Sequence, residues 1–205
     1  MNGIAKSLDA AIVKRLLQVT SEAPSGVYRP SDDTFLMLDA ICDYPFNGKN
    51  ALDVGTGSGI LGLFAAIQGA AVTVADIDEL ALRHVTRAAR SLGVRVNAIV
   101  SDLFARVDGQ FDVVLFNPPY LPSLVPVDVT VDGGWRGVAV IESFLHELAV
   151  HLKMNGTAFL LVSSLNGPSA LMEKHREFSY EVQKRRTLFF EELLVLRLRL
   201  RDFSQ

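Results

Sequence analysis

The sequence has a single cysteine, no long hydrophobic run and little excess charge, and each scarcity removes a class of protein. Cys42 cannot form a disulfide within the chain and offers no thiolate cluster for structural zinc, which suits a reducing compartment, so we expect a cytoplasmic protein. Lysine and arginine interrupt the apolar stretch of Met1–Leu17, which argues against a signal peptide or a membrane span. The 20 basic and 23 acidic side chains give a net charge of -3, so nucleic-acid binding would need a local basic patch.

The length and the amino-acid composition are those of one globular domain. With 205 residues, 49% of them hydrophobic, residues 1–205 can bury most of their apolar surface in a single core. From Asn50 onward, short β-branched runs alternate with helical stretches, as in an α/β domain whose parallel sheet is covered by helices on both faces. We expect strands at Ala51–Val54, Val72–Ala75, Arg95–Val100, Asp112–Phe116, Ala158–Val162, Tyr180–Arg186 and Glu192–Leu200. We expect helices at Ser7–Val19, from the Ser31 cap to near Cys42, and at Gly59–Ile67, Glu79–Ser91, Val138–Leu152 and Pro168–Arg176.

A glycine-rich turn follows the first expected strand of this region. The segment Leu52–Ile60 has three glycines in five residues soon after Asp53, and glycine is needed where the backbone turns sharply and approaches a ligand without a Cβ. The segment is not a P-loop, because Gly59 is followed by isoleucine and leucine. Ile60 stands where a dinucleotide fingerprint has its third glycine, which leaves dinucleotide binding as a weaker alternative.

Acidic residues follow the next two strands. Asp76 comes after Val72–Ala75, where doubly wound folds place an acid that suits the hydroxyls of a ribose. Asp78 is better explained as a helix cap. Asp102 and Leu103 follow the strand that ends at Val100, and a carboxylate beside an apolar side chain at a strand tip could bind the amine and the ring face of an adenine.

The decisive motif is Asn117-Pro118-Pro119-Tyr120, directly after a buried strand. Two prolines fix the backbone and remove its donors, so the Asn117 side-chain oxygen and the Pro118 carbonyl can both face a ligand as acceptors. Such a pair can hold a planar NH2 group and aim the nitrogen lone pair at an electrophile, which is catalysis by positioning. A rigid turn with Tyr120 as packing is the alternative, but ligands bind at the carboxyl edge of such sheets. The long connection Leu121–Arg136, which contains Trp135, is expected to be either functional or disordered.

In this order and spacing, these motifs resemble a class I S-adenosylmethionine-dependent methyltransferase that acts on planar amide or exocyclic amine nitrogens. Val27–Leu36 resembles the amino-terminal signature of the archaeal and eukaryotic HemK-like enzymes, and Asp132–Gly137 is similar to their glycine-rich segment. Those enzymes methylate the glutamine of the Gly-Gly-Gln motif in class 1 translation release factors. The implied α/β fold is a Rossmann-like three-layer sandwich with a seven-stranded, mostly parallel sheet and a terminal antiparallel pair. The helices within residues 1–45 would cover the cofactor site.

The resemblance also implies residue roles, with S-adenosylmethionine as the cofactor. Cofactor contacts would come from Thr34 near the carboxylate end, Asp53, Gly55 and Gly57 at the methionine part, Asp76 at the ribose, Asp102 and Leu103 at the adenine, and Asn117. Asn117, Pro118 and Tyr120 would be catalytic and, with Pro119, would bind the substrate amide. Arg29 departs from the family, in which this position is more usually acidic. We expect no metal, because His146 and His151 would point roughly 140° apart on a helix.

Several alternatives stay open at this point. The strongest is a methyltransferase that acts on N6 of adenine or N2 of guanine in RNA or DNA, since the same acceptor pair would serve. The basic residues of 184–186 and 197–201 could then bind nucleic acid, although a solvated strand face explains them as well. A protein-lysine methyltransferase is a weaker possibility. A scaffold without catalysis would not need Asn117–Tyr120.

The expected partners follow from the same resemblance. A class 1 release factor would be the substrate, nucleic acid is expected only under the alternative, and no membrane is expected. In archaeal and eukaryotic relatives, a small zinc-containing activator protein docks on the methyltransferase. Arg95–Val100 is expected at an edge of the sheet, where exposed backbone groups could accept an added strand from such an activator.

Overall fold

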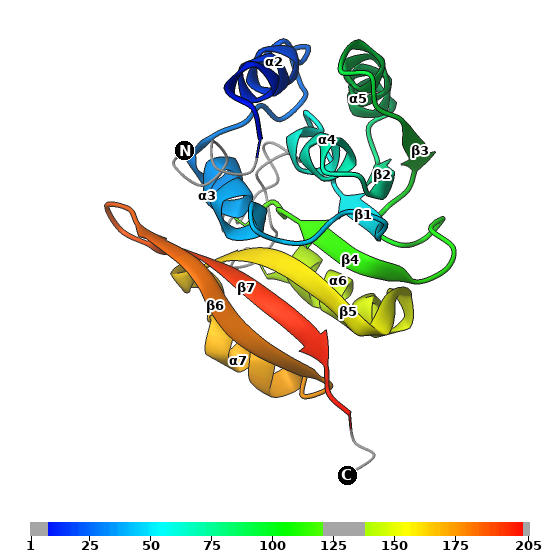
Figure 1. Ribbon diagram of the computed structural model, residues 1–205. Coiled ribbons are helices and arrows are strands. Elements are labelled where there is room, and N and C mark those ends of the chain that lie inside the picture. Colours follow the sequence, from blue (N-terminus) through cyan, green and yellow to red (C-terminus); the bar gives the residue numbers. More distant parts are fainter. Residues whose placement is uncertain (1–7, 121–137, 203–205) are drawn as a thin grey trace.

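The computed structural model describes residues 8–120 and 138–202, in which helices and strands alternate (Figure 1). The helices are α2 (Ala10–Ser21), α3 (Asp32–Ile41), α4 (Ile60–Ile67), α5 (Glu79–Ser91), α6 (Ala139–His151), the 3-10 helix η2 (Ser164–Asn166) and α7 (Pro168–Lys174). The strands are β1 (Asn50–Val54), β2 (Ala71–Asp76), β3 (Val96–Val100), β4 (Phe111–Phe116), β5 (Leu152–Ser163), β6 (Phe178–Thr187) and β7 (Glu192–Leu200). The segments Leu121–Arg136 and Asp132–Gly137 lie outside the described residues. No helix in the described part of the chain is long and apolar enough to cross a membrane.

One seven-stranded sheet has the order β3-β2-β1-β4-β5-β7-β6. The strands from β3 to β5 are parallel, whereas β7 runs antiparallel to both β5 and β6. The predicted sheet, mostly parallel with a terminal antiparallel pair, is therefore confirmed. The predicted edge position of residues 95–100 is confirmed as well, because β3 lies at one end of the sheet.

The sheet is covered by helices on both faces, which gives three layers (Figure 1). Ala51, Val113 and Phe159 point to the face packed by α2, α3, α4 and α5. Their neighbours in sequence, such as Leu52 and Val114, point to the face packed by α6 and α7. Successive side chains of a strand point to opposite faces, so central strands buried on both sides are apolar throughout.

Local capping explains why two of the helices start where predicted. The Asp78 side chain accepts a hydrogen bond from the Leu80 amide at 2.7 Å, and α5 has the predicted bounds. At the start of α3, the Ser31 amide donates to Thr34 Oγ1 at 3.4 Å, and the helix ends at Ile41. Such contacts satisfy amides that have no partner within the first turn of a helix.

The segment from Leu152 to Thr157 differs from the prediction. The helix expected at Val138–Leu152 corresponds to α6, which ends at His151. The strand expected to begin at Ala158 corresponds to β5, which begins at Leu152. Leu152 pairs with Phe111 across an irregular register, and Lys153 Nζ forms an ion pair with Asp112 Oδ2 at 2.8 Å. These contacts with β4 hold the segment in an extended form.

Candidate active site

The predicted site residues meet at one edge of the sheet. Val54, the last residue of β1, pairs with Ala75 of β2 on one side and with Phe116 of β4 on the other. The residues that follow these two partners, Asp76 and Asn117, therefore flank the glycine turn. The carboxyl ends of parallel strands form the edge at which open α/β sheets bind ligands.

The glycine turn needs glycine for conformational reasons. Gly55, Gly57 and Gly59 all have left-handed φ angles, of +59°, +51° and +83°. The Gly57 amide donates to Asp76 Oδ2 at 2.9 Å, and the Asp78 amide donates to Asp76 Oδ1 at 2.9 Å. Burial raises the pKa of Asp76, while these two amide hydrogen bonds oppose the rise. Each carboxylate oxygen has a further lone pair, so Asp76 can still accept hydrogen bonds from a ligand.

Asp53 is buried below the turn and shapes it. Its Oδ2 accepts from Thr56 Oγ1 at 2.6 Å and from the Gly62 amide at 2.9 Å. A Cβ on Gly62 would lie 2.9 Å from that oxygen, so Gly62 allows α4 to pack closely on β1. A dinucleotide fingerprint would have its close-packing glycine at position 60, where this chain has Ile60, whereas the structure shows that Gly62 allows the close approach.

Replacing Asp53 with asparagine is expected to flatten the pH dependence of folding stability. Burial raises the pKa of Asp53 from 3.8 to about 7, and the hydrogen bonds from Thr56 and Gly62 oppose that rise. The folded state then binds a proton that the unfolded state has already released, so stability present below pH 4 is lost as the pH rises toward 7. The wild type should lose up to about 1.4 kcal/mol per pH unit relative to the variant in this window. Urea unfolding of both proteins at several pH values measures this difference, and parallel stability curves would contradict it.

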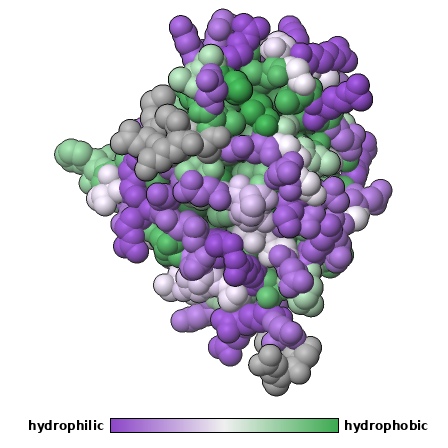
Figure 2. Space-filling view, viewed as in Figure 1, coloured by the Kyte–Doolittle hydropathy of each residue, from purple (hydrophilic) through white to green (hydrophobic). Residues whose placement is uncertain are grey.

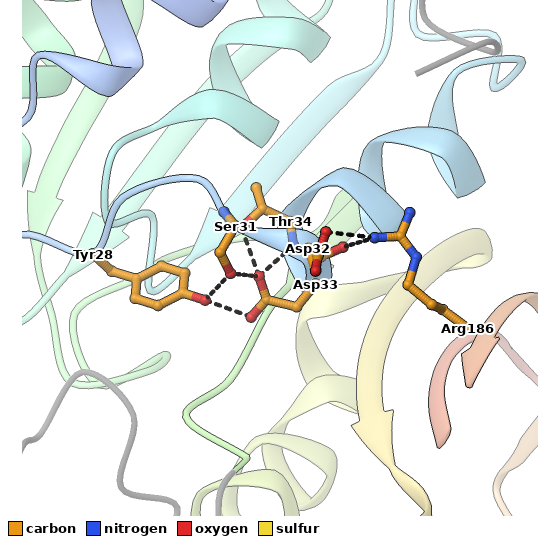
Figure 3. Close-up of polar contacts among 6 residues, drawn as sticks. All are labelled: Tyr28, Ser31, Asp32, Asp33, Thr34 and Arg186. Atoms are coloured by element: carbon orange, nitrogen blue, oxygen red, sulfur yellow. Dashed lines mark hydrogen bonds and ion pairs between the residues drawn. The ribbon is translucent and has the colours of Figure 1, made fainter. Parts of the chain in front are cut away.

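The buried carboxylate of Asp33 accepts hydrogen bonds from the side chains around the start of α3 (Figure 3). The Tyr28 hydroxyl donates to Asp33 Oδ2 at 2.6 Å, and Ser31 Oγ donates to Oδ1 at 2.7 Å. Thr34 donates to the same Oδ1 through its amide and through its hydroxyl at 3.0 Å. Asp33 is only 3% exposed. From the sequence, Asp32 and Asp33 looked alike, as two acids in the first turn of a helix.

Asp32 and Asp33 have different partners in the structure. Asp32 forms an ion pair with Arg186 Nη1 at 2.9 Å, whereas Asp33 lies beside both Tyr28 and Tyr120. Burial raises the pKa of each tyrosine hydroxyl, and the charge of Asp33 adds to the rise. Both hydroxyls therefore remain protonated donors at neutral pH. Asp33 is a site residue that sequence analysis missed, and the adjacency of two acids was the only local signal.

The backbone of Tyr28 joins this network to the glycine turn. The Ser58 amide donates to the Tyr28 carbonyl at 3.0 Å, so the segment before α3 passes over the turn. The Arg29 guanidinium folds back and donates to the Ala23 carbonyl from Nε at 3.1 Å and from Nη2 at 2.8 Å. Two of its three nitrogens thus bind the N-terminal segment.

Asn117 carries the most unusual polar atom of the site. Its Oδ1 is buried and has no hydrogen-bond partner among residues 8–120 and 138–202. A buried acceptor without a donor costs about 1–3 kcal/mol, and such atoms are rare in native proteins. The neighbouring Tyr120 is held by its carbonyl, which accepts from Asn166 Nδ2 at 2.9 Å. The acceptor therefore lies at the ligand-binding edge, next to a fixed aromatic residue.

The turn after β3 is strained at Leu103. This leucine has a φ of +43°, and its carbonyl accepts from Ser101 Oγ at 3.0 Å. A left-handed conformation costs a non-glycine residue about 1–2 kcal/mol, and such strain gathers at ligand sites. Asp102 is exposed, and Leu103 is partly buried against the core. The placement agrees with the predicted adenine contact, which stays a prediction.

The comparisons with known proteins identify the family. The methyltransferase small domain family matches residues 30–189. The chain belongs to this family. A relative from Methanocaldococcus jannaschii, named as a candidate protein N5-glutamine methyltransferase, is 35% identical over 83% of this chain and 90% of its own length. The release factor glutamine methyltransferase of Deinococcus radiodurans is 31% identical over 77% of this chain and 61% of its own length.

Solved structures of methyltransferases have the same fold as this chain. The Mtq2-Trm112 complex of E. cuniculi, responsible for methylation of the eRF1 termination factor, matches with a TM-score of 0.71 and 26% identity, over 86% of this chain and 99% of that chain. The N2 G1207 methyltransferase of 16S rRNA from T. thermophilus, in complex with AdoMet and guanosine, has a TM-score of 0.67 and 22% identity, over 84% of this chain and 44% of that chain. The predicted class I methyltransferase fold and the HemK-like resemblance are confirmed.

Proposed function

We propose that this protein transfers a methyl group from S-adenosylmethionine to the side-chain amide nitrogen of a glutamine in the Gly-Gly-Gln motif of a class 1 translation release factor. The observation that carries the proposal is the buried Asn117 Oδ1, an acceptor without a partner in the described part of the chain. An NH2 group supplies the donor that this atom lacks. A glutamine acceptor is supported by the names of the glutamine methyltransferase relatives and by the role of the E. cuniculi complex in methylating a termination factor.

The carboxyl edge of the sheet fits S-adenosylmethionine. The free lone pairs of Asp76 suit the vicinal hydroxyls of a ribose, and Leu103 offers an apolar contact for an adenine beside the exposed Asp102. We assign cofactor contacts to Thr34, Asp53, Gly55, Gly57, Asp76, Asp102, Leu103 and Asn117. The helices within residues 1–45 would cover this site, in line with the passage of Tyr28 over the glycine turn.

The site would promote methyl transfer by positioning the amide nitrogen against the methyl group of the cofactor. The cofactor supplies a methyl group that the sulfonium has already activated, whereas an amide nitrogen is a poor nucleophile because its lone pair is delocalised. Asn117 Oδ1 and the Pro118 carbonyl would accept the two amide hydrogens and orient that lone pair. The same acceptors would stabilise the positive charge that develops on nitrogen. Pro119 and Tyr120 would line the substrate amide, and no general base is assigned.

We also propose that a small, zinc-containing activator protein adds a strand to β3. This strand is one of the two edge strands of the sheet, and a groove of about 560 Å³ lies between it and α5. The groove is lined by Glu79, Leu82, Arg83, Thr86, Arg87, Arg90, Ala98 and Val100. The E. cuniculi enzyme is named as a two-protein complex, which supports a partner of this kind.

The activator proposal predicts a difference in solution behaviour. The chain expressed alone is expected to aggregate, because an open edge strand with apolar side chains can pair with other chains. Co-expression with a small zinc-binding protein of the same organism should keep it in solution, as measured by size-exclusion chromatography with light scattering. A monodisperse and fully active lone chain would count against the activator.

Methylation of a nucleobase amine is the second candidate. The basic residues of the last two strands are largely engaged within the protein, which weakens it. Arg185 pairs with Glu192 at 3.8 Å, Arg186 with Asp32 at 2.9 Å and Arg197 with Glu181 at 3.1 Å. These pairs favour the explanation as a solvated strand face, and the likeness to the rRNA enzyme supports only the fold.

Transfer of a labelled methyl group from S-adenosylmethionine tests the proposal. The substrates are the class 1 release factor of the same organism, that factor with its Gly-Gly-Gln glutamine replaced, and total RNA, each with and without the candidate activator. Label on the intact factor alone is the expected result. Label on RNA alone would move the function to a nucleobase amine.

A further inference from the structure

The turn between β6 and β7 presents two exposed aromatic side chains. Phe189 is 97% exposed and Phe190 is 82% exposed, with ring centroids 5.8 Å apart. The Leu188 amide closes the turn by donating to the Glu191 carbonyl at 2.8 Å. Figure 2 shows an apolar protrusion there, at the left of the view, with hydrophilic residues beside it. Burial of one phenylalanine contributes about 1.5–3 kcal/mol, so two exposed rings at one tip indicate a binding surface.

The tip is fixed rather than loose. On the β6 side, Arg186 Nη1 donates to the Asp32 carbonyl at 3.1 Å and to Asp32 Oδ1 at 2.9 Å. On the β7 side, the Glu191 carboxylate accepts a hydrogen bond from Ser163 Oγ. Leu188 packs against the core. A preorganised tip loses little conformational freedom on binding, which favours affinity.

Further contacts connect the tip to the Asn117–Tyr120 segment, which would hold the substrate amide. Leu193, at the start of β7, pairs with Ser163, at the carboxyl end of β5, so the turn lies at the carboxyl edge of the sheet (Figure 1). The Ser163 amide donates to Asn166 Oδ1 at 2.8 Å, and Asn166 Nδ2 in turn holds the Tyr120 carbonyl at 2.9 Å. Glu191 is close enough for its charge to raise the pKa of Tyr120.

The second tie runs through α3. Arg186 forms an ion pair with Asp32, and the carboxylate of the next residue, Asp33, accepts a hydrogen bond from the Tyr28 hydroxyl (Figure 3). Asp33 also lies beside Tyr120. Hydrogen bonds therefore connect the tip both to the Tyr120 segment and to the start of α3. A protein that brings a glutamine to Asn117 has to approach the carboxyl edge of the sheet, where the turn that carries these rings also lies.

We propose that Phe189 and Phe190 form a docking surface for the protein substrate, and that they bury their rings against an apolar patch on the domain that carries the acceptor glutamine. This inference rests on the proposed function. A protein occupant is favoured over nucleic acid because the basic residues nearest in the sequence, Arg185 and Arg186, are in ion pairs with Glu192 and Asp32. Aromatic side chains, phenylalanine included, are enriched in the buried centres of protein interfaces, where a few residues carry most of the binding energy.

The test is a double variant, Phe189→Ser with Phe190→Ser, assayed with the intact release factor and the candidate activator. We expect KM for the factor to rise at least about tenfold, with kcat within about twofold and an unchanged affinity for S-adenosylmethionine. The matched control is Val150→Ser with Met154→Ser, which removes side chains that are 68% and 61% exposed. Both lie where α6 ends and β5 begins, at the other end of β5 from the docking turn. The control should leave KM unchanged.

The outcomes separate the two proposals. If the wild type labels the factor and the double variant keeps its KM, the docking surface is wrong and the proposed function stands. If the wild type labels only RNA, both fail, and weaker RNA labelling by the double variant would assign the rings to base stacking. Loss of kcat or of cofactor affinity, without a change in KM, would also overturn the docking role.

Discussion

An Asn117→Ala variant is expected to lose about a thousandfold in the rate of methyl transfer. Its affinity for S-adenosylmethionine should change by no more than about tenfold, because one neutral hydrogen bond contributes little to binding. The reason is that the buried Oδ1 is the one side-chain acceptor assigned to the amide that reacts. Single-turnover transfer of labelled methyl groups measures the rate, and calorimetric titration measures the affinity.

Two further variants at this position separate catalysis from folding. Asn117→Leu keeps a side chain that branches at Cγ but has no acceptor, so it should be as inactive as the alanine variant. Because it also removes a buried acceptor without a partner in the described residues, its stability should equal or exceed that of the wild type. Asn117→Asp keeps an oxygen in place and should retain more activity than the leucine variant. Turnover of Asn117→Leu near the wild-type value would show that the assigned mechanism is wrong.

Gly59→Ala is expected to cause the largest loss of stability in the glycine turn, roughly 2–5 kcal/mol. The left-handed φ of +83° costs an alanine about 1–2 kcal/mol. The added Cβ would also lie 2.5 Å from Cγ2 and 2.8 Å from Cγ1 of Val85, an overlap that costs about 1–3 kcal/mol to relieve. Thermal unfolding should show Tm lower by roughly 5–15 °C.

The two causes of that loss can be separated. Gly57→Ala has a similar left-handed φ of +51° but only a 3.4 Å approach to Tyr28, so it should show mainly the smaller conformational cost. In a Val85→Ala background, the cost of Gly59→Ala should fall to a similar size, because the overlapping methyl groups are gone. Equal costs in both backgrounds would mean that Val85 does not restrict the turn.

Much of the fold could be predicted because local signals agreed with the final packing. The bounds of α5 were correct because Asp78 is a strong cap, and those of β7 were correct because leucines alternate with arginines where one face meets water. The first half of β5 could not be found in this way. Residues 152–157 have no alternating pattern, and their extended form depends on Phe111 and Asp112 of another strand.

The site shows the same division. The position of Asp76 and Asn117 at one edge follows from the rule that parallel strands end together. The role of Asp33 could not be predicted, because it depends on where the Tyr120 segment lies relative to α3. The docking tip is also a tertiary feature. The strands expected at Tyr180–Arg186 and Glu192–Leu200 already leave Phe189 and Phe190 in the connection between them. Their exposure and their place at the carboxyl edge of the sheet depend on tertiary contacts that the sequence does not show.

The strand order also dictates a sequence of events as the polypeptide leaves the ribosome. β6 is made before β7, yet in the sheet its strand partner is β7, which lies between it and β5. Until Leu193–Leu198 has emerged, the edge of β5 is open and β6 has no strand to pair with. The pairing of β5 with β7 joins segments far apart in the sequence, so the nascent chain exposes apolar β5 until β7 has been made. Closure of the sheet therefore waits for β7, which pairs with both β5 and β6.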